Sequence, residues 1–446
     1  MFTKLTKEKI VSCWLLLGIT AIGIAALYSI GLVLLSSIFF DDFMPYKDFF
    51  CSALIVHIDL SVLVWFFAIQ SAVLSQYISD SYISIVVFIL VAVGAAMLAV
   101  SPLYKAVPLI NSYIPILQNF LFAFGLALFT CGILVSNIYF LYKFITSYNH
   151  TAINHQELYV FSSAIIALVA MACIYIAHYK LQQVFYLKYH GIEDYFERLF
   201  WGGGHILQFF YIQSMQFAWI VLYNRVTSTN LQVNWFVSMV ALMNLLVVLP
   251  MLFVIVNAEI DSASYIIIFT EHRHYFVGIS PTLLATYLII KIIQNNHLRC
   301  CSFEFSILIS SMLLFFIGGI ISFFIDQNGA IITANYYGQI IGTAVALMGL
   351  SYVYLETLKF NFIKNKIVNL IPYLYFTGQL IYIVGLVISG GYGVLRKTPG
   401  EVFSVKVKMA LGLMGFGELV ALIGSLLFVY MCYSAFFCKL IKGNIR

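Results

Sequence analysis

The sequence predicts an all-α fold: a polytopic membrane bundle of about twelve transmembrane helices. Of its 446 residues, 63% are apolar and only 9% are charged, and its mean hydropathy is +0.99. A soluble core cannot bury that much apolar surface, and the apolar residues fall in runs of about 20 or more, long enough to span a bilayer. Barrel strands would be shorter and would alternate apolar with polar residues. The chain is therefore predicted to cross the membrane as helices.

Twelve runs have the length and composition of a span, with ends placed to within ~2–4 residues. They are centred on residues 11–39, 51–78, 82–104, 113–146, 157–180, 195–224, 235–256, 275–294, 303–325, 333–357, 371–394 and 407–437. The connections between them are short, without a Pro/Gly/Ser-rich linker or a soluble insert. Residues 1–446 are therefore predicted to form a single membrane domain.

The charges outside the spans predict the orientation of the chain. The net charge of +5 is spread over short loops, which indicates a topology signal and argues against nucleic-acid binding. Met1–Ile10 is a short basic leader, and the apolar run after it is too long for a cleaved signal peptide. An even number of spans places both termini on one side, which carries more than half of the 23 lysines and arginines. The positive-inside rule then favours cytoplasmic termini.

The chain is organised around Trp201–Trp219, which reads WGGGHILQFFYIQSMQFAW. His205 lies in the membrane-length part of this run, where an imidazole is costly unless it is paired, hydrogen-bonded or bound to a metal. The three glycines before it allow another backbone or a flat cofactor to approach closely. His205 is therefore a candidate site residue.

Other polar residues fall in the same outer half of the predicted bundle. His57 lies ~9 Å into the second span and His205 ~10–15 Å into the sixth, at 1.5 Å per residue. The remaining members are His272 and His274 in the connection before the eighth span, the start of the tenth span at Thr333–Gly338, and Arg396 with Lys397 after the eleventh. Each also has a structural interpretation. The histidines in spans could be hydrogen-bonded packing residues, His272 and His274 could lie in a solvent-exposed loop, and Arg396 with Lys397 could be solvated loop charges. Four histidines at matched depth favour a site, because chance would scatter them over both leaflets.

Several other polar residues are not assigned to this site. Asp59 is expected to face a different side of the helix from His57. Glu418, in the twelfth span, either carries protons or makes a packing hydrogen bond. Cysteines at eight positions include no CxxC pair and lie mostly in spans, so they read as small apolar residues. The other histidines, at span ends or in loops, are His150, His155, His178, His190 and His297.

The pattern resembles subunit I of the heme–copper oxidases over nearly the whole chain. Twelve spans carry a histidine in the second, one in the sixth, a pair between the seventh and eighth, and a motif that opens the tenth. The resemblance is closest to a bacterial branch described as cytochrome c oxidase subunit I-like or cbb3-type-like. The matching stretches are HIDLSVLVWF (57–66), WGGGHILQF (201–209), NYYGQIIGTAVALMGLSY (335–352) and YFTGQLIYIVGLVISGGYGVLRKTPG (375–400).

The resemblance implies cofactors, partners and a location. His57 would be a ligand of a low-spin heme, and His205, His272 and His274 would bind copper, since neutral imidazoles suit both iron and copper. Arg396 and Lys397 would neutralise heme propionates. The implied activity is electron transport in aerobic respiration, from cytochrome c to dioxygen or nitric oxide, together with other oxidase subunits. The implied location is the bacterial inner membrane.

The sequence departs from the family at the heme ligands. The family's His-x-His motif in the tenth span is replaced here by Asn335 and Tyr337. Asn335 stands in the place of the high-spin iron ligand, and an amide is a poor iron ligand. Tyr337 stands in the place of the second low-spin ligand, where a tyrosinate favours ferric iron. Phe209 replaces the tyrosine expected four residues after the copper histidine.

Three functions from different classes therefore remain open. The first is an oxidase-type redox protein that keeps at least one heme or the copper. The second is an inactive paralogue that serves as an assembly or partner subunit of an active oxidase. The third is a secondary transporter, for which an inverted repeat and broken helices would be expected.

Overall fold

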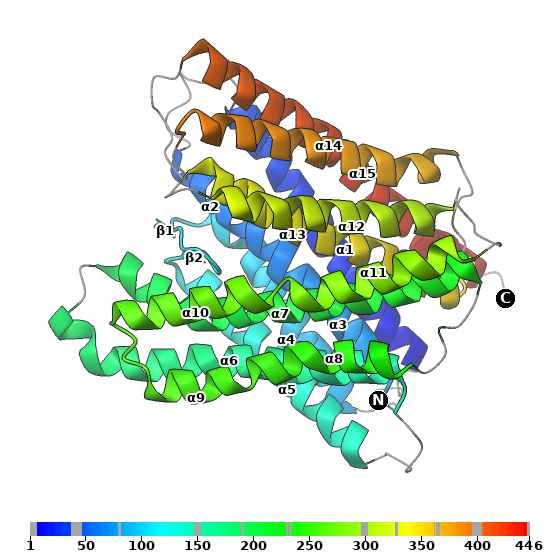
Figure 1. The fold of residues 1–446 in the computed structure, drawn as a ribbon, viewed down its shortest axis with the longest axis horizontal. Coiled ribbons are helices and arrows are strands. Elements are labelled where there is room, and N and C mark those ends of the chain that lie inside the picture. Colours follow the sequence, from blue (N-terminus) through cyan, green and yellow to red (C-terminus); the bar gives the residue numbers. More distant parts are fainter. Residues whose placement is uncertain are drawn as a thin grey trace. The chain divides into compact units, whose positions relative to one another are not determined.

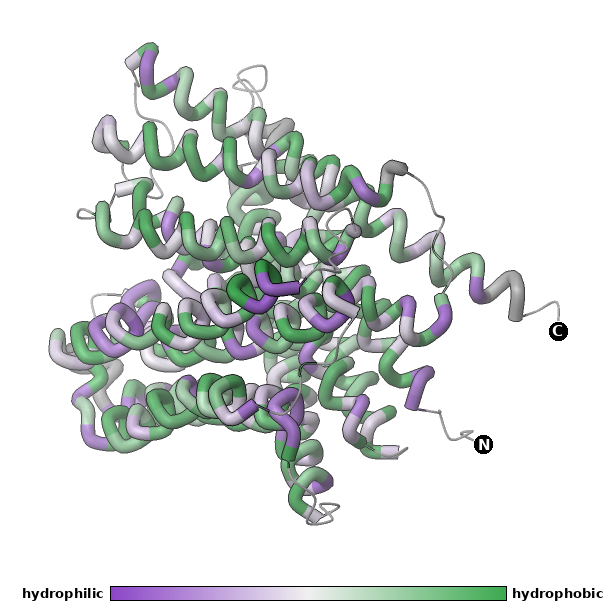
Figure 2. The backbone as a smooth tube through the Cα atoms, turned by 45° about the vertical axis from the view of Figure 1, so that its right-hand side comes forward, coloured by the Kyte–Doolittle hydropathy of each residue, from purple (hydrophilic) through white to green (hydrophobic). Residues whose placement is uncertain are grey.

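The computed structural model confirms the all-α membrane bundle (Figure 1). Within the residues that it describes, twelve helical segments are long and apolar enough to cross a bilayer. Hydrophobic residues predominate along these segments (Figure 2). The described residues are 7–36, 47–78, 82–146, 153–188, 191–228, 231, 234–295, 302–325, 329–360, 362, 366–394 and 404–443.

In the first half of the chain, to the end of the sixth span, the described residues form seven α-helices. These helices and the shorter elements between them are α1(Lys7–Ser36), α2(Lys47–Ile58), η3(Asp59–Val64), α3(Trp65–Leu74), α4(Tyr82–Val100), η4(Ser101–Leu103), β1(Pro108–Leu109), β2(Ile116–Leu117), α5(Phe120–Thr146), α6(His155–Lys188) and α7(Ile192–Thr227). The π-helical segment η3 joins α2 to α3, the 3-10 segment η4 follows α4, and a short strand pair precedes α5.

The rest of the chain continues the same pattern of long helices with short connections. Its elements are α8(Trp235–Val248), α9(Pro250–Asn257), α10(Ala263–Phe276), α11(Ile279–Ile293), α12(Phe303–Ile321), η5(Ser322–Phe324), α13(Ala330–Thr357), α14(Lys366–Gly391) and α15(Val405–Gly443).

Among the described spans, the third and ninth end in the short 3-10 segments η4 and η5, and three others are interrupted within their length. The second span widens into the π-helical η3 between α2 and α3, where the Trp65 N–H donates to the Leu60 carbonyl, five residues back. The seventh span breaks before Pro250, which has no N–H to continue the ladder, and resumes as α9. The eighth span joins α10 to α11 at Val277–Gly278.

The structure corrects the predicted start of the eighth span. That span was expected to begin near residue 275, with His272 and His274 in a loop before it, whereas α10 already begins at Ala263. The Ser262 hydroxyl accepts from the Tyr265 N–H and caps the helix. The fourth span was predicted from residue 113, but α5 begins at Phe120, because β1 and β2 pair antiparallel just before it.

The described residues fall into two compact units. The first lies within Met1–Tyr28, Asp42–Ile220 and Asn230–Ile293, and the second within Ser29–Asp41, Val221–Thr229 and Gln294–Arg446. That the two units act as one membrane domain stays a prediction.

Glycines bring helix backbones together within each unit. In the first unit, a Cβ on Gly94 would lie 2.6 Å from both the Gly125 carbonyl oxygen and the Phe129 nitrogen, so α4 and α5 touch through their backbones. In the second unit, a Cβ on Gly417 would lie 2.4 Å from the Tyr382 nitrogen, so α15 touches α14 in the same way. Small residues at such contacts are typical of membrane helix pairs, where close packing replaces the hydrophobic effect.

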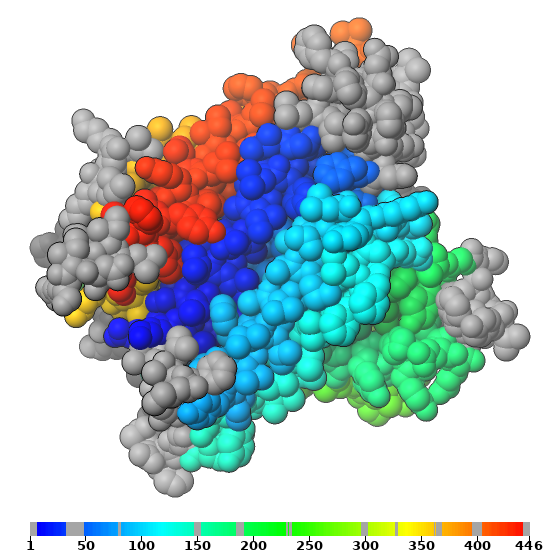
Figure 3. Space-filling view, turned by 180° about the vertical axis from the view of Figure 1, so that it is seen from behind, coloured from blue at the N-terminus to red at the C-terminus, as the bar shows by residue number. Residues whose placement is uncertain are grey.

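The outer surface of α4 and α5 is apolar. Figure 3 shows these two helices side by side in light blue and turquoise on one face of the molecule. The exposed positions of α4 are apolar and repeat along the helix at the spacing of one face. The large side chains among them are Tyr82, Ile83, Val86, Ile89, Val93 and Val100. This surface is suited to contact with lipid chains.

Candidate functional site

The three glycines of α7 are each filled by a different side chain of the same chain. A Cβ on Gly202 would lie 2.8 Å from the Tyr265 hydroxyl, and one on Gly203 would lie 2.3 Å from Ile174. A Cβ on Gly204 would lie 2.2 Å from the ring of Tyr113. Other groups do approach these glycines closely, as predicted. At the positions of the missing Cβ atoms these groups are side chains of the protein.

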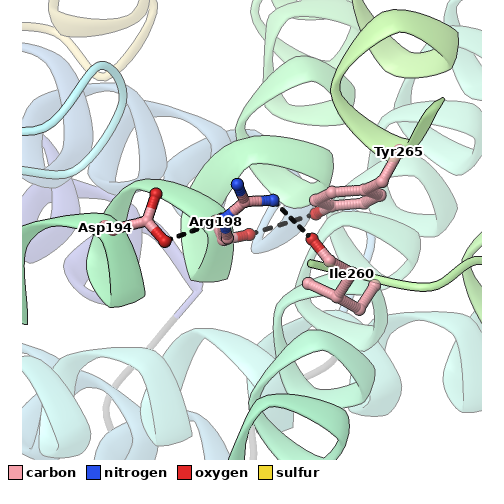
Figure 4. Close-up of polar contacts among 4 residues, drawn as sticks. All are labelled: Asp194, Arg198, Ile260 and Tyr265. Carbon is pink, nitrogen blue, oxygen red and sulfur yellow. Dashed lines mark hydrogen bonds and ion pairs between the residues drawn. The ribbon is translucent and has the colours of Figure 1, made fainter. Parts of the chain in front are cut away.

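Tyr265 inserts its hydroxyl into the backbone of α7. The hydroxyl accepts from the Gly202 N–H at 2.8 Å and donates to the Arg198 carbonyl at 3.2 Å, so it bridges a donor and an acceptor four residues apart on the helix. Arg198 also donates to the Ile260 carbonyl at 3.0 Å and to Asp194 at 2.9 Å (Figure 4). These contacts tie the start of α7 to the turn before α10 and so fix the helix one turn before His205.

Removal of the Tyr265 hydroxyl is expected to destabilise this clasp. Tyr265→Phe leaves the Gly202 N–H and the Arg198 carbonyl without their bridge in a buried place, at a cost of about 1–3 kcal/mol in the free energy of unfolding. The measurement is unfolding of the purified protein by titration with sodium dodecyl sulfate. Tyr275→Phe is the matched control on the same helix, because Tyr275 is 66% exposed. Equal stability of the two variants would contradict the role assigned to Tyr265.

His205 is buried and hydrogen-bonded within the first unit, with only 2% of its surface exposed. Its Nδ1–H donates to the Trp201 carbonyl at 2.7 Å, one turn back on α7. The Tyr113 hydroxyl lies 2.9 Å from Nε2 and the same distance from Nδ1. Because the Nδ1 proton is used on Trp201, Nε2 is the ring nitrogen that can accept from this hydroxyl. The rings of Tyr113, Trp201 and Phe269 surround the imidazole. The imidazole is thus fully accommodated by the protein.

His272 lies near His205, whereas His274 lies apart from both. His272 and Arg273 are close enough to interact electrostatically with His205. His272 donates its Nε2–H to the Val247 carbonyl at 3.0 Å, and its Nδ1 is buried with no hydrogen-bond partner among the described residues. Arg273 donates to the Gln208 side chain at 2.6 Å. His274 is exposed and its ring packs on Tyr275. The three predicted copper ligands are therefore not brought together.

His57 has the hydrogen bond expected of a metal-binding imidazole. Its Nδ1 lies 2.8 Å from the Ala25 carbonyl of α1, so Nδ1–H is the donor and the lone pair is on Nε2. A second hydrogen bond of this kind fixes the tautomer and orientation of most ligand histidines. The widened helix follows directly, and the Ser61 hydroxyl donates to the His57 carbonyl at 2.7 Å. Asp59 is buried near Tyr211 of α7, whereas His57 contacts α1, as expected for two different faces.

Asn335 makes a packing contact in the second unit. Its amide donates to the Gly318 carbonyl of α12 at 2.8 Å, and the side chain is only 2% exposed. Gly318 lies directly against α13, since a Cβ there would be 2.7 Å from the Asn335 carbonyl oxygen and from the Gln339 nitrogen. The amide is therefore committed to holding α12 and α13 together.

Tyr337 pairs with another tyrosine of the same unit. Its ring stacks on Tyr382 of α14, with ring centroids 4.8 Å apart, and the two hydroxyls are hydrogen-bonded. A phenol engaged in this way is not presented as an iron ligand. Arg396 and Lys397, the predicted partners of heme propionates, lie outside the described residues.

The described residues fit the implied heme better than the implied copper. They contain no group of three or more His, Cys, Asp or Glu side chains that could hold a metal ion. The arrangement around His205 therefore does not fit a three-histidine copper centre, and the copper ligands stay a prediction from the resemblance. His57 fits a heme-binding role through the chemistry of its ring, and that role is likewise a prediction.

Sequence reasoning missed the residues that surround His205. Tyr113 comes from the connection between β1 and β2, a segment predicted to begin the fourth span. Its hydrogen bond to His205 joins residues 92 positions apart. Gln208 is one of several polar residues in an apolar span, and the sequence predicts a loop at Arg273. No local pattern marks any of them as partners of a histidine.

Comparisons with known proteins give one relative that shows the family and a structure that shows the fold. No model of a known protein family matches the chain. A protein of Rickettsia prowazekii (strain Madrid E), described as uncharacterized protein RP382, is 31% identical, and the match covers 98% of each chain. An uncharacterized protein of Aquifex aeolicus (strain VF5) is 25% identical over 81% of this chain and 88% of its own length.

A solved structure with a similar fold is a heme–copper terminal oxidase dimer determined by cryo-electron microscopy. It matches with a TM-score of 0.76 and 14% sequence identity, over 96% of this chain and 84% of the oxidase chain. The similarity confirms the predicted oxidase-like fold. The chain belongs to the same family as RP382 of Rickettsia prowazekii, and its fold is that of a heme–copper terminal oxidase.

Proposed function

We propose that this chain is a redox protein of the oxidase subunit I type, which transfers electrons in a bacterial inner membrane through a heme held by His57. The observation that carries the proposal is the hydrogen bond from His57 Nδ1–H to the Ala25 carbonyl at 2.8 Å. This bond holds the ring in the tautomer whose Nε2 lone pair would be available to a heme iron. The heme supplies one-electron redox chemistry when it is bound.

The contribution of the protein is orientation and environment. His57 lies in the last turn of α2, and the Ala25 carbonyl of α1 fixes the orientation of its ring. The apolar surroundings of a span exclude water and tune the potential of a bound redox group. Cytochrome c as an outer-side donor, other oxidase subunits as partners, and cytoplasmic termini belong to this proposal. They rest on the resemblance and on the distribution of positive charge.

The proposal does not include dioxygen reduction at a heme–copper pair. The Tyr113 hydroxyl lies 2.9 Å from the Nε2 of His205, the atom that a copper ligand would need. Asn335 is bound to the Gly318 carbonyl at the position of the high-spin iron ligand. Each of these bonds occupies a side chain on which the standard centre depends.

A second candidate function is supported by the Asn335 contact. An inactive paralogue no longer needs metal ligands, so the residues at those positions can serve in helix packing instead. Asn335 serves in packing here, through its hydrogen bond to the Gly318 carbonyl. Such a chain would serve as an assembly or partner subunit of an active oxidase.

One experiment separates the two candidates. A reduced-minus-oxidised optical spectrum of the purified full-length protein, with iron and copper analysis of the same sample, is expected to show a heme band with iron and less than one copper per chain. A protein without a Soret band or iron would overturn the redox proposal and favour the partner subunit. A full equivalent of copper would show that the hydrogen bonds of His205 rearrange to admit the metal.

A further inference from the structure

A carboxyl group in the second unit lies among hydroxyl groups from three other helices. Glu418 of α15 accepts a hydrogen bond from Ser29 of α1 at 3.1 Å. The phenols of Tyr337 on α13 and Tyr382 on α14 lie within electrostatic reach of the carboxyl group. Tyr336 of α13 completes the set of polar side chains that interact with these two phenols. Four helices therefore contribute to one polar cluster.

Close helix packing holds the carboxyl group in this place. Gly417, the residue before Glu418, has no side chain, and a Cβ there would lie 2.4 Å from the Tyr382 nitrogen and 2.7 Å from the Gly378 carbonyl oxygen. The backbones of α14 and α15 are thus in contact. Because Glu418 directly follows Gly417, this contact brings Glu418 close to Tyr382. The rings of Tyr337 and Tyr382 stack 4.8 Å apart and hold each other in position.

Glu418 stands at the border between the bundle and the lipid. Phe416, Leu419 and Ile423 of the same helix are 57%, 45% and 52% exposed and apolar, as expected for a lipid-facing surface. Glu418 lies 13 residues after the start of the twelfth span at Val405, or about 20 Å along the helix. The carboxyl group is therefore well inside the apolar zone of the span.

A carboxylate in this setting needs a positive charge. Within hydrocarbon an isolated ionised carboxylate is strongly disfavoured unless a cation accompanies it. The side chains found with Glu418 in the described part of the chain are hydroxyl groups, and none of them is basic. The compensating cation must then come from solution. Carboxylate and hydroxyl oxygens are hard ligands, which suit a proton or an alkali ion and not a soft metal.

We propose that Glu418, with Ser29 and the Tyr337–Tyr382 pair, forms an intramembrane binding site for a monovalent cation, a proton or Na⁺. The ion binds to the carboxylate, and the hydroxyl groups of Ser29 and the two tyrosines complete its shell of oxygens. With the cation bound, the site carries no net charge. A neutral site avoids the cost of placing an ionised carboxylate at this depth in the membrane. The residues of this site belong to the second unit, and the inference does not rest on the heme proposed at His57.

The test is labelling with a fluorescent cyclohexylcarbodiimide. This apolar reagent reacts with protonated carboxyl groups inside membranes, and the labelled residue is identified by peptide mass. In the full-length protein the label is expected on Glu418, at a rate that rises as the pH falls. Added Na⁺ is expected to slow the reaction at fixed pH if the site takes Na⁺, with no effect of Na⁺ if it takes only protons.

Three variants make the test specific. Glu418→Gln keeps the size of the side chain and is expected to abolish the label on the peptide that contains residue 418. Glu356→Gln is the control, because Glu356 lies exposed at the end of α13 in an ion pair with Arg225, and labelling is expected to be unchanged. Tyr382→Phe keeps the stacked ring and is expected to change the labelling rate by about 2- to 10-fold, as for the loss of one hydrogen bond.

Two results would overturn the proposal. These are the absence of label on the Glu418 peptide at every pH, and a labelling rate of that peptide that depends on neither pH nor Na⁺. A single symmetric elution peak for each variant in size-exclusion chromatography shows that loss of label does not come from loss of fold.

Discussion

Gly318→Ala is expected to be among the most destabilising single substitutions in the second unit, although it adds only one methyl group. A Cβ at this position would lie 2.7 Å from the Asn335 carbonyl oxygen, 2.7 Å from the Gln339 nitrogen and 2.9 Å from the Gly338 carbonyl carbon. All three are backbone atoms of α13, so no side-chain rotation can relieve the clash. The two helices must separate, and the hydrogen bond from Asn335 to the Gly318 carbonyl must lengthen. Overpacking of this kind typically costs about 1–3 kcal/mol.

The next residue provides a matched control for this prediction. A Cβ on Gly319 would meet nothing within 4 Å, although it lies on the same helix one position along. Gly319→Ala is expected to leave stability unchanged or to raise it slightly, because alanine is the better helix former. The measurement is the free energy of unfolding in detergent for both variants and the unchanged protein. Equal destabilisation by the two substitutions would show that the contact between α12 and α13 is looser than these distances indicate.

His57→Ala is expected to remove the heme band from the purified protein. The prediction follows from the proposed role of His57 as the axial ligand, whose ring is held by the Ala25 carbonyl. Loss of the imidazole would remove the proposed bond between protein and iron, so the Soret absorbance per chain should fall at least about tenfold. The measurement is the ratio of heme absorbance to protein concentration, with iron analysis on the same sample.

His178→Ala is the control for this loss. His178 lies on α6 and is hydrogen-bonded to Tyr195 at 2.7 Å and to Gln182 at 2.9 Å, so it has partners of its own and no proposed role in heme binding. Its replacement is expected to leave the heme content unchanged. A His57→Ala protein that retains its full heme band would show that another residue is the ligand. Ser61→Ala, which removes a hydroxyl bonded to the His57 carbonyl, should leave the band in place.

The fold class was predictable because it follows from properties of contiguous residues. Lipid offers the backbone no hydrogen-bond partners, so an apolar run of sufficient length must form a helix. The runs around residues 82–104 and 303–325 were predicted almost residue for residue as α4 with η4 and α12 with η5. The prediction was wrong where polar residues interrupt a span. The charged run Glu271–His274 resembles a loop, yet it lies inside α10. It can do so because Arg273 donates a hydrogen bond to Gln208 and His272 donates one to the Val247 carbonyl.

The candidate site was predictable only in part. His205 and its glycines stand out because an imidazole and three small residues are unusual in a span. The sequence could not show that Tyr265, Ile174 and Tyr113 fill the three glycine positions. It also could not show that Asn335 and Tyr337 bind Gly318 and Tyr382 respectively, since each pair joins different helices.

The sequence by itself determined the membrane bundle, the approximate position of its twelve spans and the resemblance to an oxidase subunit I. Only the tertiary structure decided which of the polar span residues share a hydrogen bond and which lie apart. The physical reason is the separation along the chain of the groups concerned. The length of an apolar run is a local property, whereas the contacts of His205 with Tyr113 and of Glu418 with Ser29 join residues 92 and 389 positions apart. Such contacts arise only when helices pack.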